Sequence, residues 1–295
     1  MIYSPILVPG RRNERVIFPV TSIMGENSLL QHYTDLRTSF CKSLEICREG
    51  YSKSDLHQLR VSIKKLRTTW LLIEALSHGK WNRDEHLALF FQLFDAAGEV
   101  REAQINLNII GQYDNPTLVS YVTYLGEQQT RANEQLLEQL QVFDLEQLNV
   151  LDSVLIQQLA DFGDEEVIRE AGLYAAEGIR HLLETDWFAD DRTLHDIRKQ
   201  LKLTHDVRLI VMKLKHEEKP DELHETFDAA INQIGHWHDY CQLLKSIRKF
   251  ATDNASGQES AELDKIIACL AAEHEASRLE IQQLRAEYAA QLSRK

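Results

Sequence analysis

The chain has 295 residues, of which 33 are Lys or Arg and 46 are Asp or Glu, so its formal net charge is -13 at pH 7. Such an acidic chain is poorly suited to non-specific nucleic-acid binding, because most of its surface repels polyanions. Only 5 Pro and 12 Gly occur, and because these residues interrupt helices most strongly, the composition favours an all-α fold.

Residues 1–26 are predicted to form an extended N-terminal arm, since the stretch 16–20 reads Val-Ile-Phe-Pro-Val and shows no helical period. From residue 27 onward, apolar side chains recur at steps of three and four residues, as on the buried face of a helix. Clusters of Gly, Pro and polar residues interrupt this period. The helices predicted for the first half are 27–48, 54–77, 83–110 and 117–141.

The second half repeats this organisation after a linker. We predict a first helical half over 27–145, a linker over 146–163 with a short helix at 146–161, and a second helical half over 164–295. The helices predicted for the second half are 164–185, 193–216, 221–250 and 259–293. Short loops favour antiparallel neighbours, so each half is expected to be an up-down four-helix bundle. Ser54 and Thr193 are the predicted N-caps of the second helix in each half.

One basic pattern occurs twice along the chain. The pattern Leu-His-x-x-Arg-x-x-x-Lys begins at Leu56 and again at Leu194, an offset of 138 residues. A second pair of matching segments, 94–102 and 234–239, follows at an offset of 137. Two anchors that share nearly one offset indicate that the chain is a duplicated helical unit, with two similar halves packed together.

The repeated pattern concentrates positive charge in an acidic chain. Residues 53–67 hold five Lys or Arg against one Asp, and residues 195–215 hold six against two, a local charge of +4 in each segment. A basic site inside an acidic envelope is selective, because the rest of the surface repels a polyanion and only the focused site accepts it.

Helix geometry determines which ligand this pattern suits. At about 100° per residue, His57, Arg60, Lys64 and Arg67 lie on one helix face and extend over about 15 Å. A linear array of cations suits a linear polyanion better than a single phosphate. The alternative interpretation is an ordinary solvated helix face, and the recurrence of the pattern in both halves argues against it.

The two basic helices, the Gly98-x-x-Arg101-Glu102 segment and the internal repeat resemble the CHAD family, the conserved histidine α-helical domain. The resemblance implies two four-helix bundles related by pseudo-twofold symmetry, with a basic groove or channel between them that binds inorganic polyphosphate. The ligands that it implies are His57, Arg60, Lys64, Arg67, Arg101, His195, Arg198 and Lys202. We add the neighbouring Lys65, Lys199, His205 and Arg208 to the candidate site. The departures from the family pattern are Glu102, His205 and His238.

The predicted activity is binding without catalysis. The sequence contains no evident nucleophile–base pair, glycine-rich phosphate loop or H-E-x-x-H motif, and we expect no catalytic residue, metal ligand or cofactor. Nucleic acid is an improbable partner, because no aromatic platform for bases is interleaved with the cations. Two alternatives stay open: an adaptor for phosphorylated or acidic protein segments, and a metal-dependent phosphohydrolase that uses the His-Asp dipeptides at His195, His205 and His238.

The cysteines and the hydropathy pattern indicate a cytoplasmic protein. Cys41, Cys47, Cys241 and Cys269 form no C-x-x-C pair and are expected to be reduced. No apolar run approaches the roughly 20 residues of a membrane span, and we see no signal peptide. Polyphosphate granules and polyphosphate-metabolising enzymes stay open as further partners.

Overall fold

The computed structural model describes residues 28–113, 115–160, 162–217, 222–254 and 258–292, so the predicted arm over 1–26 lies outside the described residues. The described residues form nine α-helices and one short 3₁₀ helix, and no strand occurs among them, which confirms the all-α prediction. The elements are α1 (Ser28–Glu49), α2 (Lys53–Leu76), α3 (Asp84–Ile110), η2 (Pro116–Leu118), α4 (Val119–Val142), α5 (Leu145–Leu159), α6 (Asp164–Glu184), α7 (Asp191–Leu214), α8 (Glu222–Asn254) and α9 (Gln258–Leu292).

The two predicted N-caps are wrong by two and three residues. Ser52 caps α2, because its Oγ accepts from the backbone N–H of Asp55 at 3.2 Å while the Asp55 carboxylate accepts from the Ser52 N–H at 2.9 Å. This reciprocal capping box satisfies two N–H groups at once, which Ser54 has no partner to do. Asp190 caps α7 and accepts from the N–H of Thr193 at 2.6 Å, so Thr193 is the capped residue rather than the cap.

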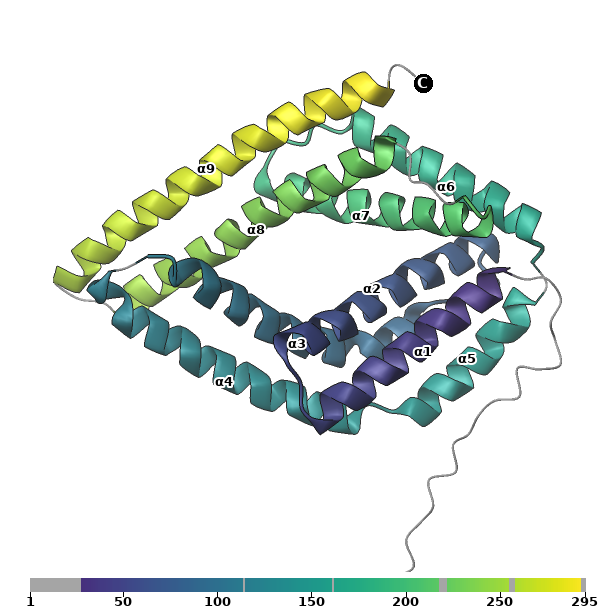
Figure 1. The fold of residues 1–295 in the computed structure, drawn as a ribbon, viewed down its shortest axis with the longest axis horizontal. Helices are drawn as coiled ribbons and strands as arrows, with labels where there is room; N and C mark the ends of the chain where they lie inside the picture. The colour runs from purple at the N-terminus through teal and green to yellow at the C-terminus, as the bar shows by residue number, and fades with distance from the viewer. Residues whose placement is uncertain (1–27, 114, 161, 218–221, 255–257, 293–295) are drawn as a thin grey trace, which may run out of the picture.

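The helices form four sides of a frame around a central opening (Figure 1). The pairs α8–α9, α3–α4 and α6–α7 form three sides, and α1, α2 and α5 form the fourth. Helices from the two halves of the chain also contact each other: α2 contacts α7, and α3 contacts α8. These four helices therefore bring both copies of the basic pattern to the inner side.

Three apolar cores hold the corners of this frame. The largest joins α1–α5 to the adjoining ends of α6 and α7, where Val167 and Val207 are fully buried. A second lies among α6–α9, around Trp187. A third joins η2 and α4 to α8 and α9, with Tyr121 and Leu243 fully buried. Each fully buried Leu or Val contributes roughly 1.5–3 kcal/mol, so the two halves are joined by apolar packing on both sides of the opening.

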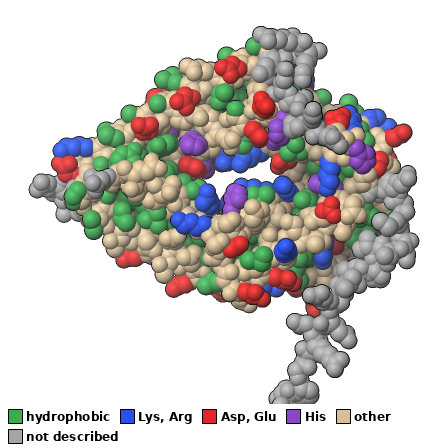
Figure 2. All heavy atoms as spheres, in the orientation of Figure 1, with side chains coloured by type: hydrophobic (Ala, Val, Ile, Leu, Met, Phe, Trp, Pro, Cys, Tyr) green, Lys and Arg blue, Asp and Glu red, His purple; other side chains and the backbone are tan. Residues whose placement is uncertain are grey.

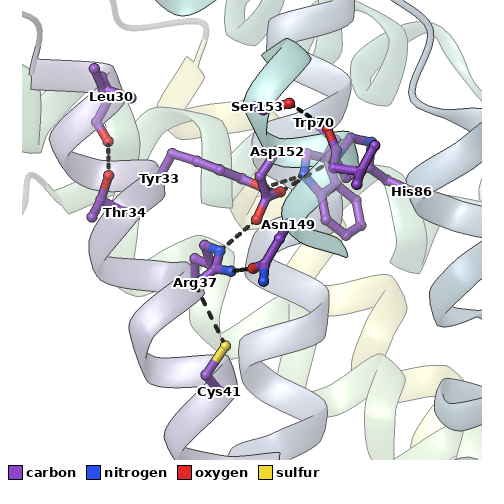
Figure 3. A network of polar contacts seen from close by, with 11 residues as sticks. Leu30, Tyr33, Thr34, Arg37, Cys41, Trp70, His86, Asn149, Asp152 and Ser153 are labelled. Carbon is purple, nitrogen blue, oxygen red and sulfur yellow. Dashed lines mark hydrogen bonds and ion pairs between the residues drawn. The ribbon is translucent and has the colours of Figure 1, made fainter. Parts of the chain in front are cut away.

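The predicted linker helix is α5, and it is an integral part of the first core. Leu148, Leu155 and Leu159 are buried on its inner face. On the same face, the almost fully buried Asp152 accepts hydrogen bonds from the Tyr33 hydroxyl and from Arg37 Nε, the latter at 2.5 Å (Figure 3). A buried carboxylate is tolerated only when it is paired in this way, so α5 is tied to α1 by charge as well as by packing.

Candidate functional site

Basic side chains line the central opening on both sides. Figure 2 shows Lys, Arg and His side chains facing each other across a passage through which the background is visible. They come from the inner helices of the two halves, α2 and α3 on one side and α7 and α8 on the other. We call the following seven residues the cation cluster: His57, Arg60, Lys64, Arg101, His195, Arg198 and Lys202.

A glycine on the neighbouring helix makes room for the Arg residue in each half. A Cβ atom on Gly98 of α3 would lie 3.1 Å from Nη1 of Arg60, and a Cβ on Gly235 of α8 would lie 3.6 Å from Nη2 of Arg198. Both guanidinium groups therefore rest against the backbone of the adjoining helix. The arrangement repeats at the sequence offsets of the basic pattern, 138 for the Arg pair and 137 for the Gly pair.

The two Arg residues differ in how far the protein satisfies their donors. Arg60 donates from Nη1 to the carbonyl oxygen of Phe94 at 3.1 Å, and its guanidinium lies 4.8 Å from the Phe94 ring. The Nε–H of Arg198 is buried and has no hydrogen-bond partner among the described residues. An unsatisfied buried donor is costly, and Arg198 Nε lies on the side of Gly235, 3.9 Å from the position of a Cβ there.

The two lysines of the cation cluster show how crowded the positive charge is. Burial, together with the charges of Lys202, Arg60 and Arg198, lowers the pKa of Lys64 to about 7. Burial, followed by the charge of Arg198, lowers the pKa of Lys202 to about 8. Since the two lysines come from different halves, the two copies of the pattern form one electrostatic site rather than two.

The histidines of the cluster are neutral near pH 7. Burial lowers the pKa of His57, and so do the charges of Arg101, Lys64 and Arg60. Burial, with Lys199 and His238, lowers the pKa of His195 to about 4. The ring of His195 stacks on that of His238 with 4.9 Å between centroids. Neutral imidazoles can donate one hydrogen bond each to an anion without adding charge.

Carboxylates offset part of this charge. Asp206 of α7 accepts from the hydroxyl of Thr68 on α2 at 3.4 Å, and burial raises its pKa. The negative charge of Asp239 opposes the lowering of the pKa of Arg198 and Lys202 by burial. The charge of Asp95 does the same for Arg60. These three carboxylates face five Lys or Arg residues of the cluster, so an excess of positive charge faces the opening.

The other five predicted site residues lie outside the cluster. Arg67 stacks on the Phe94 ring at 5.0 Å, and Lys65 is exposed. Lys199 is exposed and paired with Asp196 at 3.0 Å. His205 is buried against α8, and Arg208 lies 5.4 Å from the Phe227 ring, beside α6. Arg67 thus shares the Phe94 ring with Arg60, whereas His205 and Arg208 lie toward α8 and α6.

Sequence reasoning did not select Lys53 and His236 as site residues. Both line a cleft of about 410 Å³ between α3 and α8, together with Arg101, Asp239 and Tyr240. Lys53 precedes His57 by four residues, so the i, i+4 rule for helix neighbours could have added it to the pattern. His236 becomes part of the site only through the contact of α8 with α3, which no local pattern predicts.

The His-Asp dipeptides are dispersed. The members of His238-Asp239 approach to 4.0 Å, whereas Asp196 is paired with Lys199 and Asp206 with Thr68. Within the described ranges, two groups of side chains could hold a metal ion, and neither contains both members of a dipeptide. All four cysteines are free thiols. None of the described helices has the length and apolar character needed to span a membrane.

Comparisons with known proteins agree with this architecture. The crystal structure of the CHAD domain from the plant Ricinus communis superposes with a TM-score of 0.71, covering 89% of this chain and 91% of that chain at 13% identity. At this identity the similarity concerns the fold. No curated protein matches the chain. The sequence profile of the CHAD domain matches residues 40–248, which is more than half of the sequence. The chain therefore belongs to the CHAD domain family.

Proposed function

We propose that the chain binds inorganic polyphosphate in the central opening and does not hydrolyse it. The observation that carries this proposal is the convergence of Lys64 and Lys202, from two halves of the chain, on one charged site with Arg60 and Arg198. Polyphosphate carries about one negative charge per unit and offers only oxygen acceptors. It therefore matches a row of Lys and Arg donors, whose hydrogen bonds to phosphate are charge-assisted.

The free protein holds these cations at an electrostatic cost. Burial and mutual repulsion lower the pKa of both lysines, so part of their charge is lost near neutral pH. A bound polyanion replaces repulsion by attraction and restores the protonated lysines. Binding is thus favoured both by new contacts and by relief of repulsion.

The site suits polyphosphate better than nucleic acid. Bases bind to proteins largely by stacking on open aromatic faces, and the Phe94 ring carries the guanidinium groups of Arg60 and Arg67 at 4.8 and 5.0 Å. The chain as a whole has a net charge of -13, so a long nucleic acid that leaves the opening meets repulsion. A thin chain of phosphates can remain inside the opening.

The direct test is a titration of the purified protein with polyphosphate of defined length over a series of salt concentrations. We expect affinity to rise with chain length and to fall with salt, by roughly 0.7 log units per log unit of salt for each phosphate neutralised. Orthophosphate and single-stranded DNA serve as controls. Release of orthophosphate from the polymer during incubation would contradict the non-catalytic proposal.

A double variant locates the site. Arg60→Ala with Arg198→Ala removes the central guanidinium of each half, and we expect most of the polyphosphate affinity to be lost with helix content unchanged. The matched control is Arg131→Ala with Arg169→Ala, which removes two exposed cations of α4 and α6. Equal loss in both double variants would show that net charge, rather than the cation cluster, determines binding.

A further inference from the structure

A second group of ligating side chains lies between α7 and α8. His205 of α7 points toward α8, where Nε2 lies 3.3 Å from Oδ1 of Asp228. His224 precedes Asp228 by one turn, and its Nε2 lies 3.4 Å from Oδ2 of the same carboxylate. One ligand atom from each of the three residues can be chosen so that all lie within 4.8 Å of one another.

These separations match a four-coordinate metal site. Zinc binds imidazole nitrogen and carboxylate oxygen at about 2.0–2.2 Å in tetrahedral geometry. In a tetrahedron with bonds of that length, two ligands are about 3.3–3.5 Å apart. His205 Nε2 lies 3.3 Å from Oδ1 of Asp228, and His224 Nε2 lies 3.4 Å from Oδ2 of the same carboxylate, so each imidazole has one carboxylate oxygen at this separation. We propose that His205, His224 and Asp228 bind a zinc ion, with the fourth position open to water or an exogenous ligand.

The chemistry of the three residues supports zinc over magnesium or calcium. Two imidazoles and one carboxylate suit zinc and related transition metals, whereas magnesium and calcium prefer oxygen ligands throughout. The three side chains differ in exposure: 7% for His205, 23% for His224 and 53% for Asp228. The buried imidazole stacks on the Phe227 ring at 5.5 Å and is held in place, while the carboxylate is accessible to an incoming ion.

The other group that could hold a metal is a weaker candidate. It consists of Asp191, Cys241 and His274. Arg278 Nη1 lies 3.7 Å from the Asp191 carboxylate, so a metal ion there would have to displace an ion pair and remain beside a guanidinium.

The zinc site is separate from the cation cluster. Asp206 points from α7 to Thr68 on α2, whereas the preceding residue, His205, points to Asp228 on α8. The consecutive residues His205 and Asp206 therefore contact two different helices, α8 and α2. The zinc proposal does not depend on polyphosphate binding, and a zinc titration without polyphosphate tests it alone.

The test is calorimetric titration of the whole chain with Zn²⁺ in a buffer free of chelators. We expect one equivalent to bind tightly and to raise the melting temperature, because a ligand that binds only the folded state stabilises it. Titration with Co²⁺ adds a geometric readout, since tetrahedral Co²⁺ absorbs visible light far more strongly than octahedral Co²⁺.

Two variants address the ligands without disturbing the buried His205. His224→Ala and Asp228→Asn should each lower the Zn²⁺ affinity by about tenfold or more and abolish the tetrahedral Co²⁺ spectrum. The matched control is His181→Ala, at an exposed histidine of α6. Should the wild-type protein bind no zinc, or should Asp228→Asn retain the wild-type affinity and spectrum, the proposal is wrong.

Discussion

Thr68 of α2 donates a hydrogen bond to Asp206 of α7 at 3.4 Å, and the two residues are 138 positions apart, the offset at which the basic pattern repeats. Equivalent residues of two copies related by a twofold axis can touch each other only at that axis. The contact fits the pseudo-twofold arrangement that the resemblance to the CHAD family implies, and it does not by itself demonstrate that arrangement. The two positions hold different residues, a Thr that donates and an Asp that accepts, and the hydrogen bond depends on this difference.

The charge of Asp206 is expected to limit polyanion affinity. Its carboxylate lies among Lys202, Lys65 and Lys64, and it competes with phosphate for them. Asp206→Asn should strengthen polyphosphate binding by at least about fivefold, because one unit charge at about 4 Å contributes about 1 kcal/mol even in a water-like dielectric and more where it is partly buried. Titration at low salt measures this, with Asp196→Asn as the exposed control on the same helix. Weaker binding in Asp206→Asn would show that the carboxylate orders the lysines instead.

Polyphosphate affinity should fall as the pH rises through about 7 to 8. The pKa of Lys64 is about 7 and that of Lys202 about 8 in the free protein, so both are protonated below this window and lose charge within it. A bound polyanion raises both pKa values, and binding above pH 7 therefore takes up protons. Titrations between pH 6 and 9 measure the fall, and Lys64→Arg should reduce it. A flat profile in the wild-type protein would contradict the lowered pKa values.

The stability of the free protein should increase as the pH rises, whereas polyphosphate affinity falls. Above about pH 7 the unfolded chain, whose lysines titrate near 10.5, binds more protons than the folded protein. The free energy of unfolding therefore rises with pH between about 7 and 10. Urea unfolding at several pH values measures this rise, and saturating polyphosphate should remove it, because the bound lysines stay protonated.

The two glycines beside the arginines should respond differently to substitution. In Gly98→Ala the new Cβ would lie 3.1 Å from Arg60 Nη1, closer than ordinary contacts, so Arg60 must move and polyphosphate affinity should fall. In Gly235→Ala the corresponding distance to Arg198 is 3.6 Å, an ordinary contact. That variant should bind normally and gain roughly 0.5–1 kcal/mol from helix propensity. Parallel titration and urea unfolding of the two variants distinguish these effects.

Stability should depend strongly on Asp152, far from the opening. Its carboxylate pairs with Arg37 and Tyr33 in the first core, and burial together with this carboxylate raises the pKa of Tyr33 well above its usual value. Asp152→Ala removes the buried carboxylate that Arg37 and Tyr33 share and should cost about 3–5 kcal/mol. Urea unfolding measures the loss, and Gln157→Ala, at an exposed position of the same helix, is expected to have little effect.

The helical period of the apolar residues, and the Gly, Pro and polar residues that interrupt it, were sufficient to predict the helices, because these signals are local. The N-caps were missed because several capping residues lie close together, and the choice depends on which side chain finds a partner three residues later, as Ser52 does with Asp55. The Asp152 network joins residues more than 100 positions apart. No local pattern carries that information.

The sequence predicted those parts of the candidate site that depend on one helix face alone. It did not predict the surroundings that neighbouring helices provide. Arg67 stays beside Arg60, because both guanidinium groups lie over the Phe94 ring. The equivalent His205 is drawn toward Asp228 of α8. The repeat predicted the same role for these two positions, and the packing partners that each half supplies decided their actual environments.

The three apolar cores also have a topological consequence. They close the frame on all sides of the passage that Figure 2 shows, so a polymer has no lateral route into it. If polyphosphate binds as proposed, a linear chain that passes through the opening enters by one of its ends, and a cyclic phosphate cannot pass through in this way. The rate of encounter would follow the concentration of chain ends rather than that of phosphate, while escape would require the whole length to slide out.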